Sequence, residues 1–377
     1  MVLTDATYPT IKNGLLIRST LSGIDEHQDR TLDDDASALI LFTSGTTGKP
    51  KGVVHSLSTL SHQLADLHKA WEIDIRDEFV LSLPLNHIHG LVTGMLNGLM
   101  AGSSLTIHSQ FDAGAIWNEL SKPRTKFFTA VPTIYSRLLH AKNNVKLDHL
   151  RLMVSGSSPL SGPLLEAWSE NIRKAGIIER YGMTETGMIS TNALNEAKPG
   201  CVGKAFPSVE LQIDTAVGDE FGQVKVRGPG LFKGYLDQKT GEFVPRSPGD
   251  FFNTGDQGFL TLEGDLKLVG RDRDILKVSG YKVGCGEIEC AIMNHVSVKE
   301  CAVIGLNDPK DPSNQIIGAL LISNDSNSDK LISEMRKFLS TKLAHYKIPR
   351  KWLVSRDPLP RNLIGKPDIK EIIKLFQ

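Results

Sequence analysis

The fold is decided by the stretch Ala38-Leu39-Ile40-Leu41-Phe42-Thr43-Ser44-Gly45-Thr46-Thr47-Gly48-Lys49-Pro50-Lys51-Gly52. Its first five residues form a short apolar run, which predicts a buried strand that ends in a loop. Beyond the loop, apolar residues recur at helical spacing from Leu57 to Trp71, which predicts an amphipathic helix. The loop therefore follows a strand and precedes a helix, the usual place for binding the phosphates of a nucleotide.

The residue types of this loop suit an anion. Its glycines let the backbone turn tightly and bring N–H groups close to a phosphate, while its hydroxyls and lysines add donors and positive charge. It is not a Walker loop, because that pattern requires Lys followed by Ser or Thr, and here Lys51 is followed by Gly52. The alternative is a flexible surface loop, which does not explain such a strong bias toward phosphate donors.

Outward from the loop, strands alternate with helices. We expect strands at residues 80–83, 104–107, 126–129 and 150–154, and helices at residues 91–100, 132–139 and 164–173. This alternation predicts an α/β domain with a mainly parallel sheet. Short strands between Gly and Pro turns at residues 209–269 predict a small β-rich subdomain. Beyond the charged residues 270–274, the pattern predicts a compact α+β unit of about a hundred residues, a normal domain size.

Composition and charge exclude several functional classes. The chain of 377 residues is long enough for two domains. Its formal net charge is zero, so nothing favours nucleic acid or an anionic membrane surface as a partner. No apolar run is long enough to span a bilayer, and the N-terminus lacks the pattern of a signal peptide. The four cysteines form no C-x-x-C pair, which fits a reducing intracellular compartment. The sequence indicates no oligomeric state.

Three further motifs follow the loop in order: Arg180-Tyr181-Gly182-Met183-Thr184-Glu185-Thr186, Thr254-Gly255-Asp256 and Leu359-Pro360-Arg361-Asn362-Leu363-Ile364-Gly365-Lys366. Together they resemble the motifs of the adenylate-forming superfamily, which includes the acyl-CoA synthetases. The resemblance implies an N-terminal extension at 1–37, a partial AMP-binding adenylation domain at 38–270, a hinge at 271–274 and a mobile C-terminal domain at 275–377. ATP and coenzyme A would be co-substrates, with Mg²⁺ as the metal.

The resemblance also implies which residues bind ATP. They are Thr43, Ser44, Gly45, Thr46, Thr47, Gly48, Lys51, Gly156, Ser157, Tyr181, Gly182, Asp256 and Arg271. Tyr181 would stack on adenine, and Asp256 would bind the ribose hydroxyls, for which a carboxylate is a suitable double acceptor. Thr184 would contact the α-phosphate, and Glu185 would bind Mg²⁺, which prefers hard oxygen ligands.

The same resemblance gives Lys366 the central catalytic role. A preorganised cation between the substrate carboxylate and the α-phosphate offsets the repulsion of two anions. The implied reaction has two steps, formation of an acyl-adenylate and transfer of the acyl group to the thiol of coenzyme A. Between the steps the C-terminal domain would turn about Arg273. Gly280, Tyr281 and Lys282 would then face the active site for the second step.

The residue types near Tyr181 indicate the acid. Arg180 precedes it, and a guanidinium at the acyl pocket would bind a second carboxylate in a forked pair. The alternative is an ion pair with Glu179. His87 and His89 lie in a segment that resembles the lining of the acyl pocket, although packed core histidines are an equal alternative. The motifs look most like those of the malonate–CoA ligases of the acyl-CoA synthetase family member 3 group, so we expect malonate or methylmalonate.

Two alternatives stay open at the level of sequence. The first is a ligase for medium-chain fatty acids. The second follows from the position of the phosphate loop near residue 43, because members of the superfamily carry a long region before it. The chain would then be a truncated relative that is not catalytic and binds nucleotide weakly. We expect a cytoplasmic location from the sequence as it stands, and the resemblance also allows the mitochondrial matrix.

Overall fold

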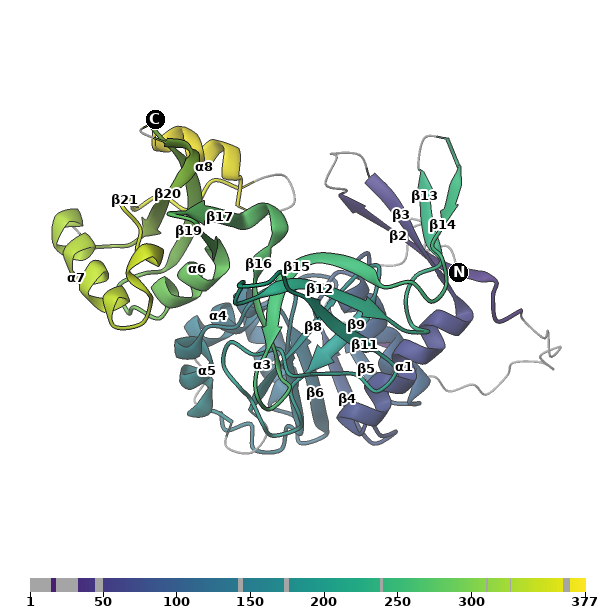
Figure 1. Ribbon diagram of the computed structural model, residues 1–377. Coiled ribbons are helices and arrows are strands. Elements are labelled where there is room, and N and C mark those ends of the chain that lie inside the picture. The colour runs from purple at the N-terminus through teal and green to yellow at the C-terminus, as the bar shows by residue number, and fades with distance from the viewer. Residues whose placement is uncertain are drawn as a thin grey trace, which may run out of the picture.

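The computed structural model describes residues 15–17, 33–44, 50–141, 145–172, 176–237, 240–309, 311–325, 327–361 and 367–377. Figure 1 shows how their helices and strands are arranged. Several predicted residues lie outside this description, namely Gly45, Thr46, Thr47, Gly48 and Lys366. The side chains of Ser44 and Arg273 also lie outside it. The predictions for these residues stay predictions.

One large sheet organises the first part of the chain. Its strand order is β1 (Leu15–Ile17), β5 (Ser104–Ile107), β4 (Glu78–Leu81), β6 (Thr125–Ala130), β7 (Leu152–Ser155), β8 (Ile177–Met183), β9 (Gly187–Thr191) and β10 (Lys204–Ala205). The strands from β5 to β8 are parallel to one another, while β1, β9 and β10 pair antiparallel. The predicted α/β fold with a mainly parallel sheet is therefore confirmed.

Helices cover this sheet where the apolar spacing predicts them. They are α1 (Leu57–Trp71), a π-helical turn (His89–Leu96) that continues as α2 (Asn97–Met100), α3 (Ala113–Leu120), α4 (Pro132–His140) and α5 (Gly162–Ser169). The hydroxyl of Ser56 caps α1 by accepting from the Thr59 amide, and Pro132 opens α4. Aromatic rings fill the space between layers, as where Phe79 stacks on Phe127 at 4.2 Å.

The prediction for the segment after the phosphate loop is wrong in one respect. The loop joins two strands, β2 (Ser37–Ser44) and β3 (Pro50–Ser56), and α1 begins only after β3. These strands are antiparallel and belong to a second sheet in the order β14 (Phe243–Pro245), β13 (Gly234–Asp237), β3, β2. The β-branched Val53 and Val54 are both buried, which favours a strand over an early start of the helix.

Two further parts complete the fold and agree with the sequence. Strands β11 (Glu210–Asp214), β12 (Gly222–Arg227), β15 (Phe252–Leu260) and β16 (Leu266–Arg271) form an antiparallel sheet in that order. The C-terminal part contains the hairpin β17 (Ile275–Val278) and β18 (Tyr281–Gly284), then α6 (Cys285–Met293), β19 (Glu300–Asp308), β20 (Asp311–Ile322), α7 (Ser328–Ser340), β21 (Lys351–Ser355) and α8 (Ile369–Leu375). It stands beside the large sheet in Figure 1 and has its own hydrophobic core.

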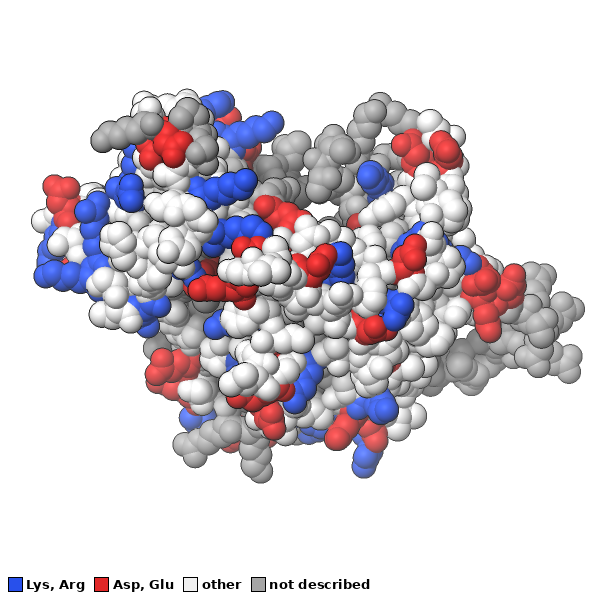
Figure 2. Space-filling view, viewed as in Figure 1, with Lys and Arg blue, Asp and Glu red and all other residues white. Residues whose placement is uncertain are grey.

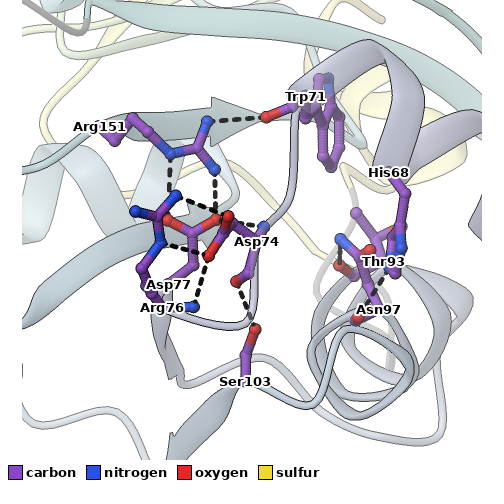
Figure 3. Close-up of polar contacts among 9 residues, drawn as sticks. All are labelled: His68, Trp71, Asp74, Arg76, Asp77, Thr93, Asn97, Ser103 and Arg151. Carbon is purple, nitrogen blue, oxygen red and sulfur yellow. Dashed lines mark hydrogen bonds and ion pairs between the residues drawn. The ribbon is translucent and has the colours of Figure 1, made fainter.

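An ion pair fastens the amino ends of the parallel strands (Figure 3). Arg151, just before β7, donates from Nε to Asp77 Oδ1 at 3.0 Å and from Nη2 to Asp77 Oδ2. Its Nη1 donates to the carbonyl of Trp71 at the end of α1, at 2.8 Å. Asp77 precedes β4, so one guanidinium joins two strands and a helix. This contact supports the edge of the sheet opposite the carboxyl ends of the strands.

The surface carries charges of both signs. On the face shown in Figure 2, Lys and Arg side chains are interspersed with Asp and Glu side chains. No helix in the described part of the chain is long and apolar enough to cross a membrane.

Candidate active site

The predicted site residues gather along one edge of the large sheet. Strands β4, β6, β7 and β8 are parallel, so their carboxyl ends meet there. His89 lies in the segment after β4, Ser157 follows β7, and Thr184 follows β8 directly. In open α/β sheets, ligands bind outside the carboxyl ends of the strands. This edge is therefore the candidate active site.

Three predicted nucleotide residues meet in one contact. The hydroxyl of Tyr181 donates to Asp256 Oδ2, and Arg271 Nε lies 2.8 Å from Asp256 Oδ1. Asp256 on β15 and Arg271 at the end of β16 are direct cross-strand partners. Burial raises the pKa of Asp256, and the charge of Arg271 opposes that shift. Both oxygens of this carboxylate thus have a partner, and the contact fixes the hydroxyl of Tyr181 on β8 against Asp256 on β15.

His89 is buried and fully bonded, whereas His87 is exposed. The ring of His89 contacts Thr129 Oγ1 through Nε2 at 2.7 Å and Ser157 Oγ through Nδ1 at 3.1 Å. The Thr129 hydroxyl donates to the Val154 carbonyl, so Nε2 carries the ring proton and Nδ1 accepts from Ser157. Burial first, and then the charge of Arg180, hold the pKa of His89 well below its ordinary value. His89 therefore positions Ser157 as a neutral ring.

Arg180 is a buried cation whose Nε and Nη2 have no hydrogen-bond partner among the described residues. Its side chain packs under the loop after β7, where a Cβ on Gly156 would lie only 2.4 Å from Nε. Glycine is therefore needed at 156. Burial lowers the pKa of Arg180 to about 9. The carboxylate of Glu179 accepts from the Leu160 amide at 2.9 Å, which does not support the alternative of a Glu179 ion pair.

Glu185 and Lys51 both contact Tyr235, a residue that the sequence did not single out. The hydroxyl of Tyr235 donates to Glu185 Oε1 at 3.1 Å. Lys51 Nζ lies 5.2 Å from the centroid of the same ring, within cation–π range. Tyr235 lies on β13, which pairs with β3, so the contact depends on a strand register that local sequence does not reveal. One ring thus links the strand after the phosphate loop to the predicted metal ligand.

The donor set at Glu185 fits a magnesium ion that is shared with a nucleotide. Among the described residues, no group of three or more His, Cys, Asp or Glu side chains could hold a metal alone. Mg²⁺ is usually bound by one or two carboxylates and completes its shell with substrate phosphates and water. Glu185 is only 9% exposed and lies one residue after Thr184, the predicted α-phosphate contact. A single buried carboxylate beside a phosphate site meets that requirement.

The structure does not bring the predicted coenzyme A residues into this site. Gly280, Tyr281 and Lys282 line a separate hollow of about 580 Å³, to which Asp219 also belongs. Lys282 Nζ pairs there with Asp219 Oδ2 at 2.6 Å, and the ring of Tyr281 stacks on Tyr346 at 4.1 Å. No residue of the candidate active site lines this hollow. The arrangement therefore differs from the one in which these residues would serve the second step.

Comparisons with known proteins connect both parts of the chain to one family. The AMP-binding enzyme family matches residues 4–236, and the AMP-binding enzyme C-terminal domain matches residues 287–366. A malonate–CoA ligase of Arabidopsis thaliana is 36% identical over 93% of this chain and 62% of its own length. The mitochondrial malonate–CoA ligase ACSF3 of Xenopus laevis is 33% identical over 91% of this chain and 66% of its own length. The chain thus spans less than two thirds of these relatives.

Solved structures agree with the fold. MatB from Rhodopseudomonas palustris, with ATP bound, superposes with a TM-score of 0.78 at 31% identity, over 92% of this chain and 69% of that one. The o-succinylbenzoate coenzyme A synthetase MenE from Bacillus subtilis, in complex with ATP and a magnesium ion, gives a TM-score of 0.77 at 28% identity, over 91% of this chain and 70% of that one.

Proposed function

The chain belongs to the AMP-binding enzyme family, and from that premise we propose that it is an acid–CoA ligase, which uses Mg·ATP to join a small carboxylic acid to coenzyme A. The observation that carries this proposal is the meeting of two groups at one sheet edge. One is the Tyr181–Asp256–Arg271 contact, which suits a nucleoside. The other is the buried guanidinium of Arg180, whose Nε and Nη2 have no hydrogen-bond partner among the described residues and which suits an acid.

In the proposed first step, the carboxylate of the acid attacks the α-phosphorus of ATP and pyrophosphate leaves. Tyr181 stacks on the adenine, and the oxygens of Asp256 use their remaining lone pairs to accept from the ribose hydroxyls while keeping their contacts with Tyr181 and Arg271. The hydroxyl of Thr184 donates to the α-phosphate at the point where charge develops. Glu185 would hold a magnesium ion, which when bound would neutralise charge on the phosphates. In the second step the thiol of coenzyme A attacks the acyl carbon, and AMP leaves.

We propose a dicarboxylic acid, malonate or methylmalonate, as the substrate. A buried cation without a partner is costly unless a ligand brings the opposite charge. The guanidinium of Arg180 is 3% exposed and lies beside His89 and the Gly156 loop, so a distal carboxylate would complete its hydrogen bonds. The malonate–CoA ligases among the relatives support this choice of acid. The compartment would be one that contains both ATP and coenzyme A, such as the cytoplasm or the mitochondrial matrix.

The test is a pyrophosphate-release assay with Mg·ATP, coenzyme A and a panel of acids: malonate, methylmalonate, acetate, propionate and octanoate. Turnover of malonate that Lys366→Ala abolishes is the expected result. Turnover of octanoate in preference to malonate would keep the ligase chemistry and reject the dicarboxylate. A folded chain that binds ATP but turns over none of these acids would favour the reading of a non-catalytic relative.

The substrate assignment is tested by replacing the cation. In Arg180→Met we expect kcat/KM for malonate to fall at least ~30-fold, because a buried charge pair loses one partner, while turnover of propionate is kept. The control is Arg137→Met, since Arg137 is an exposed arginine on α4. Its loss should leave kcat/KM unchanged for both malonate and propionate. An Arg180→Met variant that still prefers malonate over propionate to the wild-type extent would overturn the role of Arg180.

A further inference from the structure

His55 joins the two segments that carry the proposed ATP chemistry. It lies near the end of β3, the strand that follows the phosphate loop, and is fully buried at 0% exposure. Its Nε2 lies 2.8 Å from the carbonyl oxygen of Thr184, 129 residues further along the chain. The ring therefore connects β3 with the turn between β8 and β9, where Thr184 and Glu185 lie.

The contacts define one protonation state of this ring. A carbonyl oxygen can only accept, so Nε2 of His55 carries the proton and donates to Thr184. Nδ1 then accepts from the amide of Gln63 at 3.4 Å, because the hydroxyl of Thr59, 3.3 Å from Nδ1, donates to the Ser56 carbonyl at 3.0 Å. Burial lowers the pKa of His55, which favours the same neutral ring. A second proton on Nδ1 would face the amide group of Gln63, itself a donor.

Gln63 closes the space beneath the same turn. Its Nε2 donates to the Gly230 carbonyl at 2.6 Å, and a Cβ on Gly187 would lie 2.2 Å from its Cδ. Gly187 also adopts a left-handed conformation with φ of 64°, so the turn passes over Gln63 with no room for a side chain. The amide of Phe232 donates to the Glu185 carbonyl at 2.8 Å. Two successive carbonyls of the turn are thus fixed from outside it.

From this geometry we propose that His55 is a positioning residue for the ATP step, which holds the Thr184–Glu185 turn in place through one hydrogen bond and couples it to the strand after the phosphate loop. The proposal rests on the proposed function for its catalytic meaning. His55 is fully buried, so it acts through the Thr184 carbonyl. Small displacements of groups that act in the transition state lower kcat more than they change binding.

The test compares two variants in which an amide side chain, Gln or Asn, replaces His55. The amide nitrogen of Gln lies near the place of the imidazole Nε2, so His55→Gln keeps a donor for Thr184, whereas His55→Asn is too short. In ATP–pyrophosphate exchange with malonate, we expect His55→Asn to lower kcat roughly 3- to 10-fold, the worth of one neutral hydrogen bond, with KM for malonate unchanged. His55→Gln should keep most of the rate. His62→Asn is the matched control, because His62 is an exposed histidine on α1.

A second readout does not depend on activity. Amide hydrogen exchange of residues 181–188 should become faster in His55→Asn, and stay at the wild-type rate in His55→Gln and His62→Asn. Equal exchange and equal kcat in His55→Asn and wild type would overturn the proposal, as would a His55→Gln variant impaired as much as His55→Asn. If the wild-type chain activates no acid, the proposed function fails, and the exchange experiment still decides whether His55 holds the turn.

Discussion

At the scale of single residues, the buried carboxyl of Glu179 makes the stability of the fold depend on pH. Burial raises its pKa to about 7, from an ordinary value of 4.5. Between these values the folded carboxyl holds a proton that the unfolded one has released, so the free energy of unfolding falls as pH rises, by up to about 3 kcal/mol. Glu179→Gln keeps an oxygen that can accept from the Leu160 amide, but it has no proton to release. The variant should therefore not lose stability as pH rises. Urea unfolding of both proteins at pH 5 and pH 8 checks it, and a stability difference that is the same at both pH values would contradict it.

The contact of Tyr235 with Glu185 leads to a prediction about the affinity for Mg²⁺. The hydroxyl of Tyr235 donates to Glu185, so Tyr235→Phe removes a contact that orients the carboxylate while the ring beside Lys51 remains. We expect the Mg²⁺ concentration for half-maximal rate to rise roughly tenfold, the value of a hydrogen bond to a charged acceptor, with KM for the acid unchanged. Electron paramagnetic resonance of Mn²⁺ binding in the presence of ATP measures the same change without turnover. Unaltered Mn²⁺ affinity would show that the hydroxyl does not orient Glu185.

The sequence indicated some site residues and missed others for a physical reason. Tyr181 and Asp256 lie in motifs with family resemblance, and the structure joins them directly. His55 and Tyr235 belong to no motif that was singled out, because what matters is their partners across the fold. His55 reads as one more buried strand residue until β3 is placed against the turn at Thr184. Residue types predict chemistry, whereas positioning contacts appear only with tertiary structure.

At the scale of elements, the hairpin β2–β3 changes how the phosphate loop works. A loop between a strand and a helix uses the helix N-terminus for anions. Here the loop leaves one antiparallel strand and enters another, and α1 begins seven residues after Pro50. Local pattern could not separate these cases, because Val53 and Val54 suit the start of an apolar helix face as well as a buried strand. Lys51 and Tyr235 therefore take their places from strand pairing.

The strand ends opposite the site supply a prediction about stability. Asp77 is 4% exposed and carries the forked pair with Arg151, which is 33% exposed. Asp77→Asn leaves that guanidinium without its charge partner, and we expect a loss of about 2–3 kcal/mol, below the value for a fully buried pair. Urea unfolding followed by tryptophan fluorescence measures it. Arg76→Ala, which breaks an exposed pair nearby, serves as the control and should leave the midpoint unchanged. Equal midpoints for all three proteins would argue against this fastening role.

At the scale of the whole molecule, no hydrophobic cluster in the described part of the chain spans both the adenylation part and the C-terminal part, which suits the proposed turn of one part against the other. One core lies around the large sheet, and another lies between β20, α6 and α7 of the C-terminal part. The change from α/β to α+β pattern near residue 270 predicted this division. The orientation of the two parts was beyond the sequence, because it depends on contacts between residues far apart in the chain, such as Lys282 with Asp219. Contacts of that kind are weak and leave little trace in residue spacing.

The pair of Lys282 with Asp219 leads to a prediction about the two steps. Lys282 is expected to face the acyl-adenylate in the second step, so its contact with Asp219 must break first. The pair stabilises the present orientation, and both side chains are partly exposed, at 45% and 27%. Asp219→Asn should therefore leave acyl-adenylate formation unchanged and speed the transfer to coenzyme A by at most ~5-fold, the upper value of an exposed ion pair.

Single-turnover transfer from a preformed acyl-adenylate measures this step alone. Raising the salt concentration should speed the wild type and have less effect on Asp219→Asn, because screening weakens the same contact. Glu220→Gln is the control, since Glu220 is the exposed neighbouring acid and makes the same change of net charge. If Asp219→Asn slows the transfer while Glu220→Gln does not, then Asp219 helps the turn of the C-terminal domain rather than holding it back. The present orientation of the two domains would then be an intermediate between the two steps.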